Sequence, residues 1–154
     1  MDVTLVNIME KVINDEDLEP GEGIIHHEEG IDFIPANIEL AGLETALVNV
    51  MSREMILRQY LCSVKEQYDY ILIDCMPSLG MITINALVAA DSVLIPVEAA
   101  YLPVKGLQQL IKTIGRVHRK LNPQLSIMGI LFTKSRPENE FCKRYCWTDQ
   151  RGLW

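Results

Sequence analysis

The sequence predicts an α/β domain in which a mostly parallel sheet is flanked by helices. Apolar residues make up 49% of the 154-residue chain and charged residues 23%, which is typical of a globular domain with a core. From residue 69 to residue 133, apolar stretches of strand length alternate with stretches of helical periodicity. Such alternation implies parallel strands joined by crossover helices. The apolar run 70–73 ends in Asp74, and ligands of open α/β sheets bind at the ends of strands.

The N-terminal part predicts a helix, a hairpin and a longer helical stretch. Residues 4–14 place apolar side chains at helical spacing, with Thr4 as the N-cap. Short apolar runs at 24–25 and 31–34 enclose a polar turn, which predicts a hairpin. Residues 40–67 read as a helix in two pieces, because the apolar stripe changes phase near Ser52, which we expect to cap the second piece.

The remaining elements form the predicted parallel sheet. Residues 69–75 read as its central strand, apolar on both faces and therefore covered on both sides. A helix over 81–90, a strand over 92–97, an amphipathic helix over 103–121 and a strand over 127–133 follow. Residues 134–154 have no apolar period. We therefore predict one domain over residues 1–133 and a divergent tail, without assigned order, over 134–154.

Charge is unevenly distributed along the chain. The net charge is −7, yet residues 1–60 hold 13 acidic and 3 basic side chains, whereas residues 99–154 hold 10 basic and 3 acidic ones. The balance argues against a general nucleic-acid binder, and a solvated helix face is the simpler interpretation of the basic third. Local contact with a polyanion is the alternative. No run reaches the roughly 18 apolar residues of a membrane span, and no signal peptide is recognisable, so a cytoplasmic protein is expected.

Cysteine and histidine patterns allow metal binding but do not favour it. Cys62 and Cys75 lie in apolar patterns and are expected to be small buried side chains. Cys142 and Cys146 have the spacing of half a metal site without a second pair. The adjacent His26 and His27 would point to opposite faces of a strand and so converge poorly on one metal ion. A solvated turn is therefore the better interpretation of this stretch.

The most informative pattern is Asp74-x2-Pro77-x2-Gly80, directly after the apolar run. An acid in this position can simply cap a turn or a helix. It can also hold one water of a Mg²⁺ ion, because this hard cation prefers oxygen ligands and keeps several waters. Gly80 would then let a backbone N–H approach a phosphate.

Several segments together resemble the ParA/Soj family of chromosome and plasmid partitioning ATPases. They are residues 35–44, 68–80, 83–97 and 106–110, and the resemblance covers about residues 3–133. Met76 stands where many members have proline. The resemblance implies a P-loop α/β fold and a dimer that sandwiches Mg-ATP. It also implies DNA binding without sequence preference and a ParB-like partner protein that stimulates hydrolysis.

The resemblance also assigns roles to individual residues. Asp74 corresponds to the Walker B aspartate that holds the Mg²⁺ shell through water. Pro77, Ser78 and Gly80 correspond to the loop that senses the γ-phosphate. Residues 98–102 correspond to a segment near the dimer face.

One part of the family pattern has no counterpart in this sequence. No Gly-x4-Gly-Lys-Ser/Thr phosphate loop occurs. We therefore expect an internal fragment that lacks the P-loop strand, has an open sheet edge and does not hydrolyse ATP alone. A non-catalytic module that binds DNA or a partner is the alternative, with Lys112, Arg116, Arg119 and Lys120 as candidate DNA contacts. Relatives that assemble iron–sulfur clusters suggest a third option through Cys142 and Cys146, although their usual spacing is Cys-x-x-Cys.

Overall fold

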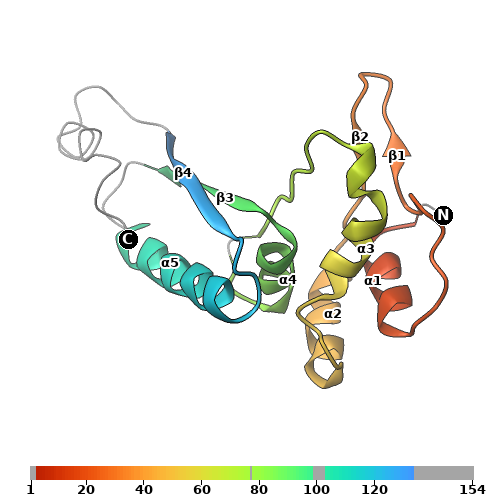
Figure 1. The fold of residues 1–154 in the computed structure, drawn as a ribbon, viewed down its shortest axis with the longest axis horizontal. Helices are drawn as coiled ribbons and strands as arrows, with labels where there is room; N and C mark the ends of the chain where they lie inside the picture. The colour runs from red at the N-terminus through yellow and green to blue at the C-terminus, as the bar shows by residue number, and fades with distance from the viewer. Residues whose placement is uncertain (1–2, 77, 99–102, 134–154) are drawn as a thin grey trace.

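The computed structural model describes residues 3–76, 78–98 and 103–133, which form helices and two pairs of strands (Figure 1). In chain order the elements are α1 (Leu5–Ile13), β1 (Ile25–His26), β2 (Asp32–Phe33), α2 (Leu40–Ala46), the 3₁₀ turn η1 (Leu47–Asn49), α3 (Ile56–Val64), the 3₁₀ turn η2 (Lys65–Gln67), α4 (Met81–Ala89), β3 (Ser92–Glu98), α5 (Pro103–Lys120) and β4 (Ser126–Thr133). Among the described residues, no helix combines the length and the apolar character needed to cross a bilayer.

Helices α1, α2 and α3 build the first apolar core. The helical periodicity predicted for residues 4–14 is confirmed, and Thr4 is the N-cap of α1. Its backbone N–H donates to Oδ1 of Asn7 at 3.0 Å, which fixes the first turn. Ile8, Leu47 and Tyr60 are almost completely buried in this core.

The predicted hairpin is present above this core (Figure 1). Strands β1 and β2 pair antiparallel, with Ile25 opposite Phe33 and His26 opposite Asp32. Gly30 closes the turn at φ +81°, a left-handed conformation that costs glycine little. The interpretation of residues 26–30 as a solvated turn is therefore confirmed.

The expected break between α2 and α3 is present, but Ser52 does not cap α3. Ser52 has φ +52°, and its carbonyl accepts from the N–H of Met55, which is the N-cap of α3. A side chain from another helix supplies the cap, because Leu57 N–H donates to Oδ1 of Asn85 at 3.2 Å. Sequence spacing could not predict a bond across 28 residues.

The C-terminal part confirms the predicted strand–helix–strand order. Strands β3 and β4 run parallel, with Ile95 opposite Ile130 and one irregularity between Val93 and Leu94. Helix α5 covers one face of this pair, and a second core forms around Ile95, Ile114 and Val117. Helix α4 lies between the two cores (Figure 1).

The predicted central strand over residues 69–75 is wrong. This segment is assigned to no strand, and the described sheets are the two pairs β1–β2 and β3–β4. Tyr70 is 88% exposed and Leu72 is 94% exposed, so the segment is not covered on both sides. A strand requires a hydrogen-bonded neighbour, and no described residue provides one.

The expectation that Cys62 and Cys75 are buried is also wrong, because both residues are exposed. Cys62 lies on the outward face of α3. Cys75 lies in the segment whose outer face is uncovered. Apolar surroundings in the sequence therefore did not translate into burial at either position.

Candidate functional site

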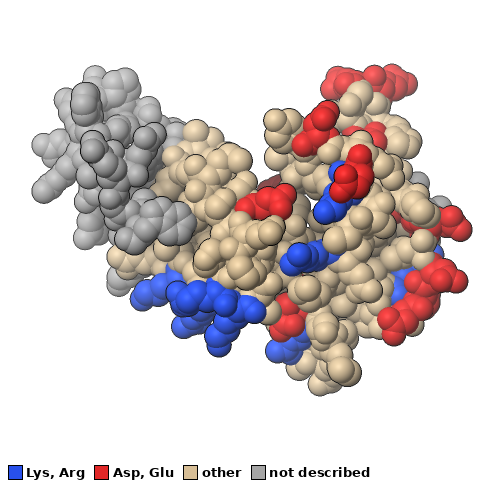
Figure 2. Space-filling view, in the orientation of Figure 1, with Lys and Arg blue, Asp and Glu red and all other residues tan. Residues whose placement is uncertain are grey.

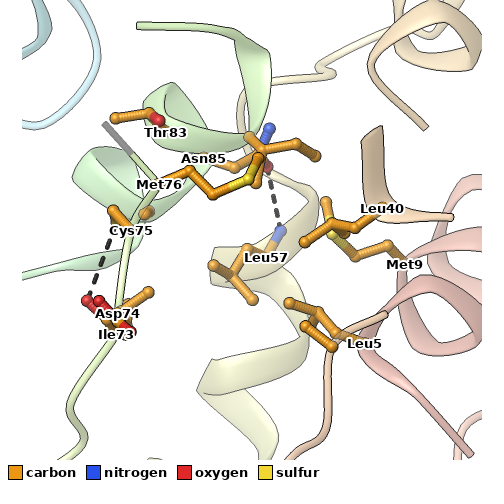
Figure 3. Close-up of a pocket in the computed structure, with 13 residues that line it drawn as sticks. Leu5, Met9, Leu40, Leu57, Ile73, Asp74, Cys75, Met76, Thr83 and Asn85 are labelled. Carbon is orange, nitrogen blue, oxygen red and sulfur yellow. Dashed lines mark hydrogen bonds between the residues drawn. The ribbon is translucent and has the colours of Figure 1, made fainter. Parts of the chain in front are cut away.

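The segment that carries Asp74 passes along a small apolar pocket of about 80 Å³ (Figure 3). Residues 73–76 form one wall, and helices α1, α2, α3 and α4 together with Ala36 contribute the others. Figure 3 labels the lining side chains Leu5, Met9, Leu40, Leu57, Ile73, Asp74, Cys75, Met76, Thr83 and Asn85. The inner face of the segment thus packs on the helices, and its outer face remains uncovered.

Asp74 is exposed at the C-terminal end of this extended segment. No hydrogen bond or ion pair links its carboxylate to a described residue. An uncommitted carboxylate keeps all its lone pairs for water or a cation, which suits the water-mediated magnesium contact expected from the sequence.

The loop after Asp74 leads directly into helix α4. The N–H of Ser78 donates to the carbonyl of Met76 at 2.7 Å, and the hydroxyl of Thr83 donates to the carbonyl of Ser78 at 2.8 Å. Gly80 is the N-cap of α4, with φ −74° and ψ −176°. Asp74, Ser78 and Gly80 therefore lie on one continuous stretch that ends at the N-terminus of helix α4. Pro77 lies outside the described residues.

Cys75 adjoins Asp74, and its thiol is partly enclosed at the pocket wall. The Sγ atom lies 3.8 Å from the carbonyl oxygen of Ile73. Burial raises the pKa of the Cys75 thiol, and the negative charge of Asp74 adds to the effect. The protonated thiol is thus favoured, which argues against a nucleophilic role.

Two residues that sequence reasoning did not single out hold helix α4, which lines the pocket, against neighbouring segments. Asn85 is completely buried, and its amide donates to the carbonyls of Arg53 and Met81 at 2.7 and 3.1 Å. Glu44 on α2 reaches the start of α4, where its Oε1 lies 3.5 Å from the N–H of Ile82. The bonds from Asn85 to Arg53 and from Ile82 to Glu44 join residues more than 30 positions apart in the sequence. No local sequence pattern indicates such contacts.

The four candidate DNA contacts lie together on α5, away from the pocket. Lys112, Arg116, Arg119 and Lys120 are all exposed, and Figure 2 shows a basic patch along this helix. Lys112, Arg116 and Arg119 line a groove of about 540 Å³, together with apolar residues that include Ile127. None of the four forms an ion pair with a described residue. Arg119 and Lys120 also lie in the last turn of α5, where cations stabilise a helix end.

The remaining candidates are the metal-binding positions and the dimer-face segment. Among the described residues, no group of three or more His, Cys, Asp or Glu side chains is placed to hold a metal ion. Cys142, Cys146 and residues 99–102 lie outside the described residues. The structure consequently leaves the cysteine pair and the dimer-face segment as predictions.

The chain is similar to several known proteins. A protein-family model described as an AAA domain matches residues 2–127. The sporulation initiation inhibitor protein Soj of Bacillus subtilis is 53% identical over 105 residues, which are 68% of this chain and 42% of Soj. The chromosome partitioning protein ParA of Myxococcus xanthus is 46% identical over 128 residues, which are 82% of this chain and 44% of that protein. The chain belongs to the ParA/Soj family.

A solved structure shows the fold of this ParA/Soj chain. The cobyrinic acid a,c-diamide synthase of Mycobacterium smegmatis, solved with bound ADP and magnesium, matches 92% of the chain with a TM-score of 0.82 and 32% identity. The match covers 56% of that synthase. The fold is therefore the α/β fold of the P-loop nucleotide hydrolases, and the chain spans less than half the length of its curated relatives Soj and ParA.

Proposed function

We propose that this chain carries the magnesium and γ-phosphate half of the ATP site of a ParA/Soj-type partitioning ATPase. The observation that carries the proposal is the position of Asp74. Its exposed carboxylate has no described partner and stands six residues before the N-cap of α4. Membership of the ParA/Soj family supports the proposal, as does the ADP and magnesium bound to the M. smegmatis synthase.

Each residue of the loop has a separate role in this proposal. Asp74 holds a water of the Mg²⁺ shell, as the hard cation prefers oxygen ligands. Pro77, Ser78 and Gly80 form the loop that meets the γ-phosphate, where the N–H groups at the start of α4 favour negative charge. Bound Mg²⁺ would neutralise the charge that develops on the phosphate oxygens.

We expect no ATP hydrolysis from this sequence alone. A phosphate cradle of the Gly-x4-Gly-Lys-Ser/Thr type does not occur in the 154 residues. Phosphoryl transfer depends mainly on positioning and charge neutralisation, and the cradle lysine supplies part of both. A cradle from another polypeptide segment is therefore required for hydrolysis.

An ATPase assay on two proteins tests this. The 154-residue chain is expected to show no turnover above background. A chimera that places the N-terminal segment of B. subtilis Soj before this chain is expected to hydrolyse ATP, and Asp74→Ala is expected to lower its rate by about 10²-fold or more. Asp69→Ala, which removes an exposed acid at the other end of the same segment, serves as the matched control. Robust turnover by the chain alone that vanishes in Asp74→Ala would contradict the need for a separate cradle.

A second candidate function is non-catalytic binding of DNA, in support of segregation of a chromosome or plasmid. The exposed basic patch on α5 favours it, because Lys112, Arg116, Arg119 and Lys120 have no described ionic partner. We expect DNA affinity to fall with salt, with a log–log slope of about 0.9 for each phosphate contacted.

Replacement of the four basic residues by alanine is expected to reduce that slope. Arg58→Ala with Lys65→Ala on α3 and η2 is the control for loss of positive charge elsewhere. Binding that ignores salt, or is equal in both variants, would favour the solvated-face interpretation.

The partners follow from the same family membership. We propose a homodimer in the intact partitioning protein, with residues 98–102 near its interface, and a ParB-like protein that stimulates hydrolysis. We also propose a cytoplasmic location, in keeping with these partners.

A further inference from the structure

Helix α4 begins against a side chain from a distant helix. Gly80, its N-cap, has φ −74° and ψ −176°, which is extended backbone open to any residue. Its backbone conformation therefore does not require glycine. A Cβ atom at this position would meet the carboxylate of Glu44, 2.6 Å from its Cδ and 2.7 Å from its Oε2, so a larger residue would displace this carboxylate.

The Glu44 carboxylate replaces the capping group that glycine lacks. Gly80 has no side chain to bond the first N–H groups of α4, and no side-chain cap bond comes from it. Oε1 of Glu44 lies 3.5 Å from the N–H of Ile82, in the first turn. A negative group at this end also interacts favourably with the helix dipole.

Glu44 is held in place from its own helix. Its neighbour Leu43 is buried in the first core, as is Leu47 one turn further on. These side chains anchor α2 and thereby fix the backbone position from which the Glu44 side chain reaches α4. The contact thereby ties the first core to the turn at 78–80.

We propose that Glu44 is a positioning residue that fixes the 78–80 turn, and that glycine at position 80 leaves room for its carboxylate. Its relevance to nucleotide binding rests on the function proposed above, since the same turn is assigned to the γ-phosphate. The contact itself exists without nucleotide, so it can be tested independently of that function.

A double-mutant cycle on the full 154-residue chain tests the contact. Gly80→Ala is expected to lower the urea midpoint in the wild-type background, because it displaces the Glu44 carboxylate from the start of α4, and to lower it less in Glu44→Ala, where there is no carboxylate to displace. Glu44→Gln keeps the shape and should retain the penalty, whereas the shorter Glu44→Asp should relieve it. Gly42→Ala on α2 is the matched control, because its Cβ would meet nothing within 4 Å. Equal effects of Gly80→Ala in all backgrounds would overturn the proposal.

Hydrogen exchange keeps the test decisive if Gly80→Ala does not fold. Loss of the cap in Glu44→Ala should accelerate exchange at the N–H of Ile82 by about tenfold. Glu44→Gln should preserve protection because it retains an acceptor oxygen, and Thr45→Ala should change nothing. Unchanged protection of Ile82 in Glu44→Ala would overturn the proposal.

The two proposals fail separately. Absence of Asp74-dependent turnover in the Soj chimera, with coupling between positions 44 and 80 intact, rejects the ATPase site and leaves the positioning role. Turnover without coupling rejects the positioning role alone.

Discussion

Asp32 is held by two side chains that bond different oxygens of its carboxylate. The hydroxyl of Tyr68 donates to Oδ2 at 2.7 Å, and Nδ1 of His26 lies 2.7 Å from Oδ1. The bond from Tyr68, then that from His26, lowers the pKa of Asp32 below its ordinary value, and the same bond raises the pKa of Tyr68. This cluster fastens the β1–β2 hairpin to the start of the segment that carries Asp74.

Tyr68→Phe is expected to raise the pKa of Asp32 toward its ordinary value, because it removes the hydrogen bond that lowers this pKa most. A lowered carboxyl pKa favours folding above the unfolded pKa of about 4, and this contribution is lost as pH falls through the folded value. The mutation should therefore weaken the dependence of stability on pH below about pH 4. NMR titration of the Asp32 carboxyl measures the shift. Tyr70→Phe, at an exposed tyrosine nearby, should leave it unchanged.

At the scale of elements, buried asparagines join helices that lie apart in the sequence. Asn85 caps the start of α3 from inside α4. Asn122, which follows α5, donates to the carbonyls of Leu87, Val88 and Ala90 at 3.2, 3.1 and 2.7 Å, and so closes the end of α4. Both side chains satisfy backbone groups that every helix end leaves free. They hold α4, and with it the loop at 78–80, between the two cores.

Asn122→Ala is expected to destabilise the chain by about 2–3 kcal/mol, because the carbonyls at the end of α4 lose their buried donor. Asn122→Asp should cost at least as much, since it turns an acceptor toward carbonyl oxygens. Urea denaturation measures both. Asn49→Ala, at an exposed asparagine in η1, is the control, and an equal effect there would count against the capping role.

At the scale of the whole molecule, one face of the C-terminal sheet and the outer side of residues 70–76 have no cover among the described residues. Leu94 and Leu131 on β3 and β4 are exposed opposite the face that α5 covers, and Leu72 is exposed on the unpaired segment. Two-stranded sheets are marginally stable in water, and uncovered apolar surface favours association. Of the family fold, the described residues thus form the helices and one parallel pair of strands, β3 and β4.

We expect the chain to melt at low temperature or to associate with other copies. Leu72→Lys combined with Leu131→Lys should reduce the associated fraction and the binding of a hydrophobic dye, because charge on these positions opposes burial. Sedimentation at several concentrations and dye fluorescence measure both. Arg58→Lys, which keeps charge on the N-terminal part, is the control. A monodisperse monomer with a cooperative thermal melt and no dye binding would contradict the expectation.

Local signals predicted the elements well, and the candidate site in part. The helices α1, α3, α4 and α5 follow from apolar spacing, and β3 and β4 from short apolar runs between turn residues. The stretch from Asp74 to Gly80 was found because its residue types and spacing are contiguous in the sequence. Membership of the ParA/Soj family followed from the same stretches and is shown by the comparisons.

The sequence by itself determined the elements, the acid at position 74 and the family, because each depends on neighbouring residues. Only the tertiary structure decided that residues 69–75 remain unpaired, since a strand exists only where a distant segment supplies hydrogen bonds. It also decided what surrounds position 80. The loop conformation allows any residue there, but the carboxylate of Glu44, 36 positions away, occupies the space that a side chain would need.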